Sequence, residues 1–289
     1  MRILVTGADG QLGRELQRLA ARRAPHNDYL FTGAAQLDIT DREAVRRAVG
    51  ELRPGVVVNC AAYTDVERAE TDPDAADRVN RLAPGYLAEA AEAAGALLIH
   101  ISTDYVFDGR SCRPYDETAP AAPLNVYGRT KLAGERAILD SGCRHLILRT
   151  AWLYSEHGRN FLKTMLRLTA ERERLQVVCD QTGTPTWAAD LARTVFDRIE
   201  RGDCRDAAEG IYHFSDEGVC SWYDFAVEIA AAAGHDRCRI APCRTEEFPT
   251  AARRPAYSVL DKTKIRSAFG IEIPHWRQSM LECLKRMKP

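Results

Sequence analysis

The sequence predicts an α/β fold, in which helices cover both faces of a parallel sheet, followed by a smaller C-terminal domain. In the first half of the chain, short apolar runs alternate with amphipathic helical segments, an order typical of strand–helix–strand units. These runs are apolar throughout rather than alternating with polar residues, which indicates strands buried on both faces. The sheet is therefore expected to be doubly wound.

The elements of this sheet can be placed along the chain. Strands are expected at residues 2–6, 29–32, 56–59, 97–102 and 145–149, and helices at 11–24, 83–94 and about 127–140. A capping box at Thr40–Glu43 would open a further helix that ends near Leu52. Beyond Thr150 the alternation loosens, with helices expected near 160–173, 188–200, 221–233 and 276–285, and a strand at 211–214.

A glycine-rich loop directly follows the first strand. Gly7, Gly10 and Gly13 are spaced GxxGxxG, with Gln11 and Leu12 between the last two. Glycines let a backbone turn tightly and approach a pyrophosphate, whose charge the helix N-terminus then favours. Because the loop joins a strand to a helix, it predicts a dinucleotide site. We therefore expect a Rossmann-type NAD(P)-binding domain over residues 1–155. Residues 156–289 would form mainly a substrate-binding domain, with some elements returning to the Rossmann core.

The segment after the second strand bears on the choice of dinucleotide. NAD-selective enzymes usually carry an acid about 20 residues beyond the loop, whereas residues 31–34 here read Phe-Thr-Gly-Ala. Nothing in that segment would repel a 2′-phosphate, and Arg14 could help to hold one. We therefore expect NADPH, or use of both NADPH and NADH.

Composition excludes several classes of protein. The chain has 289 residues, 45% of them hydrophobic, and a net charge of -1, without the basic excess of a nucleic-acid binder. Its nine cysteines are scattered with no CxxC pair, which favours free thiols over a zinc or redox motif. No apolar stretch approaches the ~18 residues of a membrane span, and the N-terminal one is too short for a signal peptide. We expect a cytoplasmic protein without nucleic-acid or membrane partners.

Three residues predict carbonyl chemistry. Tyr127 and Lys131 are four residues apart at the start of a helix and so share one face. A phenol can donate a proton to a carbonyl oxygen while hydride reaches the carbon, and a nearby ammonium lowers its pKa from about 10. Thr103 lies at the end of the fourth strand, at the sheet edge where ligands bind. Its hydroxyl could bond the same oxygen.

The chain also resembles the dTDP-4-dehydrorhamnose reductases of the extended short-chain dehydrogenase superfamily. The resemblance covers nearly the whole chain and rests on NCAAYTDVERAE, STDYVFDG, NVYGRTKLAGE, RTAWLYSEHGRNF, DQTGTPT and RRPAYSVL. It implies reduction of dTDP-4-dehydro-L-rhamnose (a dTDP-linked 4-keto-6-deoxy-L-mannose) to dTDP-L-rhamnose, using NADPH or NADH.

The resemblance also implies roles by position. Tyr127 would be the proton donor, and Lys131 its partner and a ligand of the cofactor ribose. The other cofactor positions, besides the glycine loop, would be Asp38, Ile39, Ala61, Ala62, Tyr63 and Thr64. Thr103, Asp104, Tyr105 and Trp152 would contact the sugar nucleotide, and Arg254 would pair with its diphosphate.

Some members of the family form dimers around a magnesium ion held by acidic side chains. Glu15 and Asp190 are two such positions here, but the sequence offers no third, so no metal site is predicted. A monomer or a homodimer is expected.

Two alternatives stay open. One is another nucleotide-sugar 4-ketoreductase or an epimerase, although no Cys–His or Cys–Lys pair is identifiable for epimerase chemistry. The other is a non-catalytic NADP-binding regulatory subunit, like that of methionine adenosyltransferase. The complete set of Thr103, Tyr127 and Lys131 argues against the latter, because binding alone does not require it.

Overall fold

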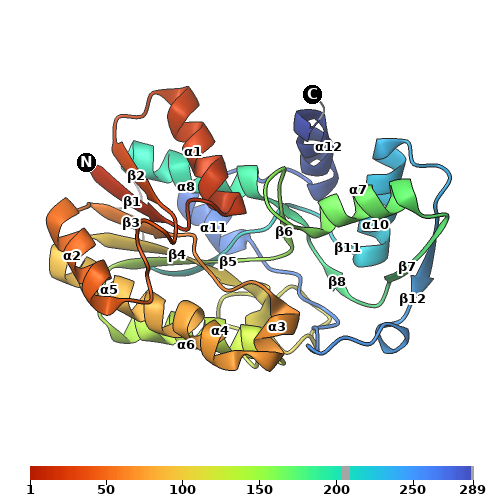
Figure 1. The fold of residues 1–289 in the computed structure, drawn as a ribbon, viewed down its shortest axis with the longest axis horizontal. Coiled ribbons are helices and arrows are strands. Elements are labelled where there is room, and N and C mark those ends of the chain that lie inside the picture. Colours follow the sequence, from red (N-terminus) through yellow and green to blue (C-terminus); the bar gives the residue numbers. More distant parts are fainter. Residues whose placement is uncertain (203–208, 288–289) are drawn as a thin grey trace.

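The computed structural model describes residues 1–202 and 209–287, and a six-stranded parallel sheet lies at its centre (Figure 1). The strand order is β10-β5-β4-β3-β1-β2, and every neighbouring pair is parallel. The strands are β1 (Arg2–Thr6), β2 (Asp28–Thr32), β3 (Val56–Asn59), β4 (Leu97–Thr103), β5 (His145–Thr150) and β10 (Gly210–His213). The predicted α/β class is confirmed.

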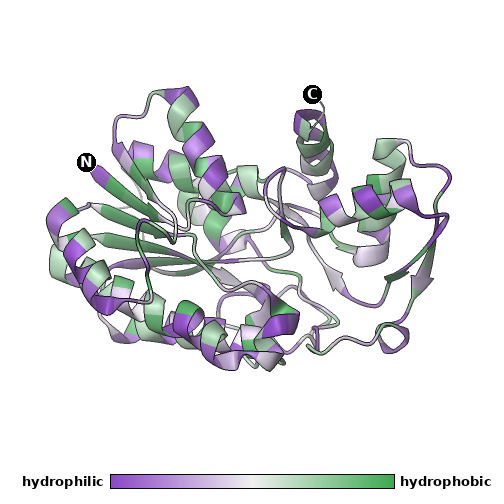
Figure 2. Cartoon of the chain, viewed as in Figure 1, coloured by the Kyte–Doolittle hydropathy of each residue, from purple (hydrophilic) through white to green (hydrophobic). Residues whose placement is uncertain are grey.

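Helices cover both faces of this sheet. One face carries α1 (Gln11–Arg23), α8 (Ala188–Arg201) and α11 (Thr263–Phe269), and the other carries α2 (Arg42–Leu52), α5 (Ala83–Ala94) and α6 (Val126–Asp140). Each face has its own apolar core, with Leu16 and Val195 in one and Val45 and Leu87 in the other. Figure 2 shows the inner strands as predominantly hydrophobic. This double burial explains why they read as continuous apolar runs.

The strand order reverses between β1 and β3, because the chain runs from β1 outward to β2 and then back to β3 on the other side. In open α/β sheets the ligand crevice lies at the carboxyl ends of the strands at such a point. Gly7 follows β1 with φ +70°, and a Cβ there would lie 2.5 Å from the backbone nitrogen of Ala61. Only glycine permits both this backbone conformation and this approach.

A further, smaller apolar core, containing Tyr154, Phe225 and Trp276, lies on the side of the sheet's carboxyl edge. It is formed by α7 (Phe161–Glu171), α10 (Trp222–Ala233), α12 (Trp276–Met287) and three small sheets. These pair β7 (Arg174–Val178) with β12 (Arg239–Cys243), β8 (Thr182–Gly183) with β11 (Cys220–Ser221), and β6 (Leu153–Tyr154) with β9 (Thr186–Trp187). From the same half of the chain, α8 and β10 pack with the main sheet.

Some details differ from the sequence-based expectations. Asp41 caps α2 by accepting from the amides of Glu43 and Ala44, whereas the Thr40 hydroxyl donates to Asp38. The capping box at Thr40 is therefore wrong. Several elements were not expected. They are α3 (Val66–Thr71), α4 (Pro73–Asp77), a π-helical turn (Arg78–Leu82) leading into α5, helix α11, the short strands β6, β7, β8, β9, β11 and β12, and two 3-10 turns (Asp104–Val106 and Thr245–Glu247). Most of these are too short to show a helical period.

Candidate active site

The glycine loop leaves the start of α1 open. Gly10 is the N-cap in an extended conformation, no side chain caps the helix, and its first turn holds no acid. A Cβ on Gly13 would lie 2.4 Å from the carbonyl oxygen of Gly7, so the loop folds tightly on itself. The amides at a helix start without such partners suit an anion. This arrangement fits the pyrophosphate of a dinucleotide.

Two other loop residues face away from this opening. The Leu12 side chain is buried in the apolar core between the sheet and α8. Gln11 Oε1 accepts hydrogen bonds from Ser155 and Asn160 at 3.1 and 2.9 Å. The Gln11 side chain therefore ties the loop to the segment after β6.

The remaining predicted cofactor positions lie after β2 and β3. Asp38 is exposed and accepts hydrogen bonds from Thr40, whereas Ile39 is buried in the core. After β3, Ala61 and Ala62 are partly buried, and Thr64 reaches a large cavity. Asn80 holds the Tyr63 backbone, accepting from its amide at 2.9 Å and donating to its carbonyl at 3.1 Å.

Asp9 of the glycine loop lies close to the end of β2. A Cβ on Gly33 would lie 2.0 Å from Asp9 Oδ2, so the carboxylate packs against the end of β2. An acid is therefore present where the local segment contains none, because the glycine loop supplies it. Arg14 Nε donates to the Asp9 carbonyl oxygen at 3.0 Å, which places a cation beside this acid.

The structure brings Thr103, Asp104 and Tyr127 together at the carboxyl edge of the sheet. Thr103 Oγ1 donates to Asp104 Oδ1 at 3.0 Å and accepts from the Tyr105 amide at 3.2 Å. The Tyr127 ring lies edge-on to the Tyr105 ring, with centroids 5.7 Å apart. A Cβ on Gly128 would lie 2.2 Å from the Tyr105 carbonyl oxygen, so this glycine lets α6 approach.

The electrostatics differ from the expected pairing of Tyr127 with Lys131. Desolvation raises the pKa of Tyr127 to about 12, and its hydrogen bond with Thr103 opposes the rise. Lys131 Nζ is held instead by the Ile101 carbonyl oxygen at 2.6 Å. Desolvation lowers the pKa of Lys131 to about 8 and raises that of Asp104 to about 7. The expected lowering of the phenol pKa is therefore not met.

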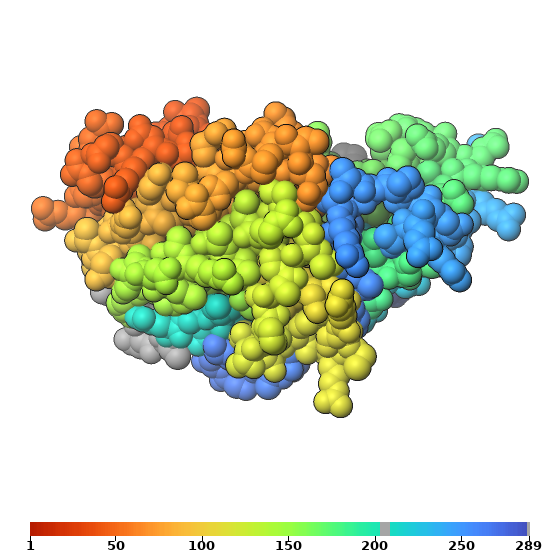
Figure 3. Space-filling model, turned by 90° about the horizontal axis from the view of Figure 1, so that it is seen from below, coloured from red at the N-terminus to blue at the C-terminus, as the bar shows by residue number. Residues whose placement is uncertain are grey.

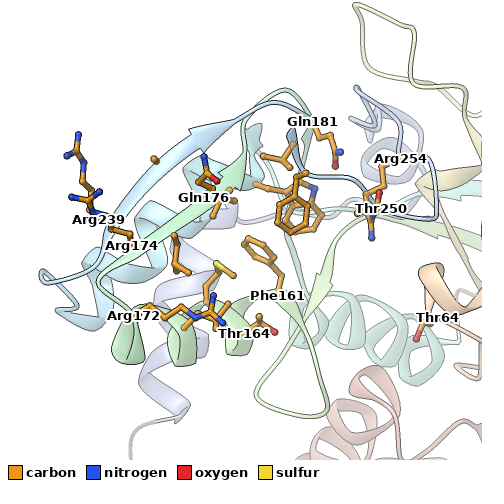
Figure 4. Close-up of a pocket in the computed structure, with 18 of the residues that line it drawn as sticks. Thr64, Phe161, Thr164, Arg172, Arg174, Gln176, Gln181, Arg239, Thr250 and Arg254 are labelled. Carbon is orange, nitrogen blue, oxygen red and sulfur yellow. The ribbon is translucent and has the colours of Figure 1, made fainter. Parts of the chain in front are cut away.

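A cavity of about 1250 Å³ extends from this edge into the smaller core (Figure 4). Thr64 and Arg254 line one part of it, whereas Arg172, Arg174 and Arg239 lie at the opposite end. Tyr105 also lines the cavity and its side chain contacts Arg254. Trp222 is a further lining residue, with its indole stacked 3.5 Å from that of Trp152.

Trp152 itself has φ +46° and packs behind Trp222. A positive φ is strained for a non-glycine residue. Because Trp222 lines the cavity and Trp152 stacks on it from behind, the indole that faces the cavity is that of Trp222. The sequence analysis missed this residue.

Arg254 lies in a segment that α3 holds in place. Arg254 Nη2 lies 2.6 Å from Glu67 Oε1, while Glu67 Oε2 accepts from the amides of Ala251 and Ala252 at 2.8 and 3.2 Å. Figure 3 shows this blue segment against the orange surface that includes α3. Glu67 thus orients the segment that carries Arg254.

The same short helix also holds the start of α6. Glu70 accepts from the Val126 amide at 2.7 Å, and Asn125 caps α6 while donating to the Arg253 carbonyl oxygen. The sequence analysis missed Glu67, Glu70 and Asn125. A detectable signal was Asp65 in an N-cap position, with two glutamates three residues apart behind it.

Comparison with known proteins shows the family. Residues 1–288 match the family described as RmlD substrate binding domain. The chain is 43% identical to a dTDP-4-dehydrorhamnose reductase of Burkholderia thailandensis, over 99% of this chain and 98% of that protein. This chain belongs to the dTDP-4-dehydrorhamnose reductase family.

Further members and relatives agree with this assignment. The solved dTDP-4-dehydrorhamnose reductase of Bacillus anthracis, in complex with NADP, is 38% identical with a TM-score of 0.92 and 99% of each chain covered. A probable dTDP-4,6-dihydroxy-2-methyloxan-3-one 4-ketoreductase of Streptomyces antibioticus is 44% identical over 98% of this chain and 94% of that protein. The predicted family is confirmed.

The two acidic positions considered for magnesium in the dTDP-4-dehydrorhamnose reductase family have basic neighbours. Buried Glu15 lies 2.7 Å from Arg18 and 3.3 Å from Arg286, and Asp190 lies 2.9 Å from Arg193. Within residues 1–202 and 209–287, no group of three or more acidic, His or Cys side chains could hold a metal ion. No helix in the same ranges is long and apolar enough to cross a membrane.

Proposed function

We propose that this protein reduces the 4-keto group of dTDP-4-dehydro-L-rhamnose to give dTDP-L-rhamnose, with NADPH as the cofactor. The observation that carries the proposal is the convergence of Thr103, Asp104 and Tyr127 at one edge of the sheet. This cluster lies between a loop suited to a pyrophosphate and a cavity of about 1250 Å³. Family membership and the NADP complex of the relative from B. anthracis support the same chemistry.

The cofactor would lie along the carboxyl edge of β1, β2 and β3. The pyrophosphate would be held by the loop backbone at Gly7, Gly10, Gln11, Leu12 and Gly13. Asp38 and Ile39 would lie near the adenine. The rest of the cofactor would run along Ala61, Ala62, Tyr63 and Thr64. Bound NADPH supplies the hydride. Asp9 and Arg14 act oppositely on a 2′-phosphate, so we propose that the protein also uses NADH.

Tyr127 would deliver the proton. With a pKa of about 12 the phenol stays protonated at neutral pH, so it is a competent donor to the 4-oxygen. Thr103 would hold that oxygen in place, and Lys131 would bind the cofactor ribose. Oriented donors at the reacting oxygen stabilise the charge that develops there.

The sugar nucleotide would occupy the cavity, with Asp104 and Tyr105 near the sugar and Trp222, backed by Trp152, beside it. Arg254 would pair with the diphosphate, since a guanidinium can bond two phosphate oxygens at once. We further propose that residues 1–155 serve mainly the cofactor and 156–289 mainly the substrate, apart from α8 and β10. The protein would act in the cytoplasm as a monomer or homodimer.

A second candidate is another dTDP-sugar 4-ketoreductase, which the relative from S. antibioticus favours. The deciding experiment follows the loss of NADPH absorbance with dTDP-4-dehydro-L-rhamnose and identifies the product by NMR. Formation of dTDP-L-rhamnose supports the proposal. No turnover with this sugar, alongside turnover with another dTDP-4-keto sugar, would favour the second candidate. Absence of any turnover would refute both.

A further inference from the structure

A row of buried polar side chains runs across the sheet to Lys131. Thr6 Oγ1 donates to Asn59 Oδ1 at 2.8 Å, and Asn59 Nδ2 lies 3.0 Å from His100 Nδ1. His100 Nε2 in turn lies 3.2 Å from Lys131 Nζ. All four residues are at most 1% exposed. Buried polar groups of this kind need defined hydrogen-bond partners, but only Lys131 has a part in the function proposed above.

The hydrogen bonds of this row have a defined direction. The Ala61 amide donates to Asn59 Oδ1 at 3.1 Å, and an N–H can only donate. Asn59 therefore turns its oxygen to Ala61 and its NH2 group to His100. Because that NH2 group is also only a donor, His100 Nδ1 must accept. Burial lowers the pKa of His100 well below its ordinary value, so the ring is neutral and carries its proton on Nε2.

This tautomer matters for Lys131, because it points the Nε2–H of His100 at the lysine nitrogen. A neutral amine can accept that hydrogen through its lone pair, whereas an ammonium has three donors and no acceptor. The Ile101 carbonyl, 2.6 Å from Lys131 Nζ, can accept from either form. Only neutral Lys131 can therefore accept the hydrogen of His100 and complete the row of hydrogen bonds. In the ammonium form, an N–H of Lys131 faces the Nε2–H of His100, so two donors oppose each other.

We propose that His100 is a positioning residue that weakens the hold of Lys131 on its proton, through a tautomer that Asn59 imposes. The inference rests on the proposed function, in which Tyr127 gives a proton to the substrate, and it adds that Lys131 supplies the proton that replaces it. A lysine that releases its proton near neutral pH makes this replacement easier.

Other charged groups around Lys131 act in different directions. Desolvation is the largest influence on Lys131 and lowers its pKa to about 8, while Glu135, one turn further along α6, acts to raise it. Glu135 is itself paired with Arg149 of β5 at 2.7 Å. On the other side, Asp104 and Tyr127 interact with each other and with Thr103. His100 is the titratable side chain of β4 that contacts Lys131 Nζ.

The first test uses the wild-type protein and needs no substrate. Imidazole 15N NMR reports which nitrogen of each of the seven histidines is protonated. For the signal that His100→Gln removes, we expect a neutral ring protonated on Nε2. A ring protonated on Nδ1 would overturn the proposal, and the variant serves only to assign the signal.

The second test measures Lys131 directly. The chain has six lysines, so 13C-labelled lysine gives a simple spectrum in which Lys131→Met assigns one signal. His100→Gln offers Lys131 a carbonyl acceptor, and its titration midpoint should rise by about one pH unit or more. His100→Phe removes the N–H without adding an acceptor and should give a smaller rise. Unchanged midpoints in both folded variants would mean that burial alone sets the pKa of Lys131, and would overturn the proposal.

The kinetic consequence has a defined sign. If reduction needs protonated Lys131, turnover falls as pH rises through its pKa, so His100→Gln should move this loss to higher pH by the same amount. Because the NMR titration needs no sugar, a shifted midpoint together with an inactive wild type would count against the proposed function and not against the role of His100.

Discussion

Removing one oxygen atom, in Tyr127→Phe, tests the proposed chemistry most directly. The substitution keeps the ring that packs edge-on against Tyr105 at 5.7 Å and removes only the hydroxyl beside Thr103. Loss of one hydrogen bond should change the free energy of unfolding by about 1 kcal/mol. A positioned general acid contributes about a hundredfold to ten-thousandfold in rate, or roughly 2.7–5.5 kcal/mol of activation free energy.

The assay is single-turnover oxidation of NADPH at saturating sugar nucleotide, with NADPH binding measured separately by fluorescence. Turnover should fall at least about a hundredfold while NADPH binding is retained. Tyr86→Phe is a matched control, because it makes the same change on α5, where Tyr86 packs with Arg42. A folded, cofactor-loaded Tyr127→Phe enzyme within about tenfold of wild type would refute the reasoning. The proton would then come from Asp104, Tyr105 or water.

Three other predictions follow from the site. Arg254→Ala should raise the KM for the sugar nucleotide about tenfold or more without altering NADPH affinity. Glu67→Gln leaves the arginine in place and should raise this KM less. Equal effects of the two substitutions would mean that Arg254 only anchors its loop. Asp9→Asn should raise the kcat/KM ratio of NADPH to NADH by about fivefold, and an unchanged ratio would remove Asp9 from cofactor choice. Burial raises the pKa of Asp104 from 3.8 to about 7. The fold therefore favours the protonated carboxyl, and the stability that this group contributes is fully present below pH 3.8 and is lost as the pH rises through about 7. Between pH 5 and pH 8, the free energy of unfolding of Asp104→Asn in urea should therefore rise relative to that of wild type by a few kcal/mol. A difference between the two proteins that does not change with pH would contradict the shifted pKa.

Local patterns in the sequence determined the main sheet, the glycine loop and the shared helix of Tyr127 and Lys131. Burial on both faces produces continuous apolar runs, and the turn of an α-helix places residues four apart on one face. For the same reason, α3 and α4 escaped prediction, since five or six residues hardly contain a period.

Tertiary structure alone decided which side chains meet across these elements. Asp9 reaches the end of β2, Glu67 holds the segment of Arg254, and Lys131 faces Ile101 and His100 rather than lowering the pKa of the phenol. Each of these contacts joins segments far apart in the chain. Periodicity reports only how a segment is buried, whereas the order of the strands decides which loop ends become neighbours.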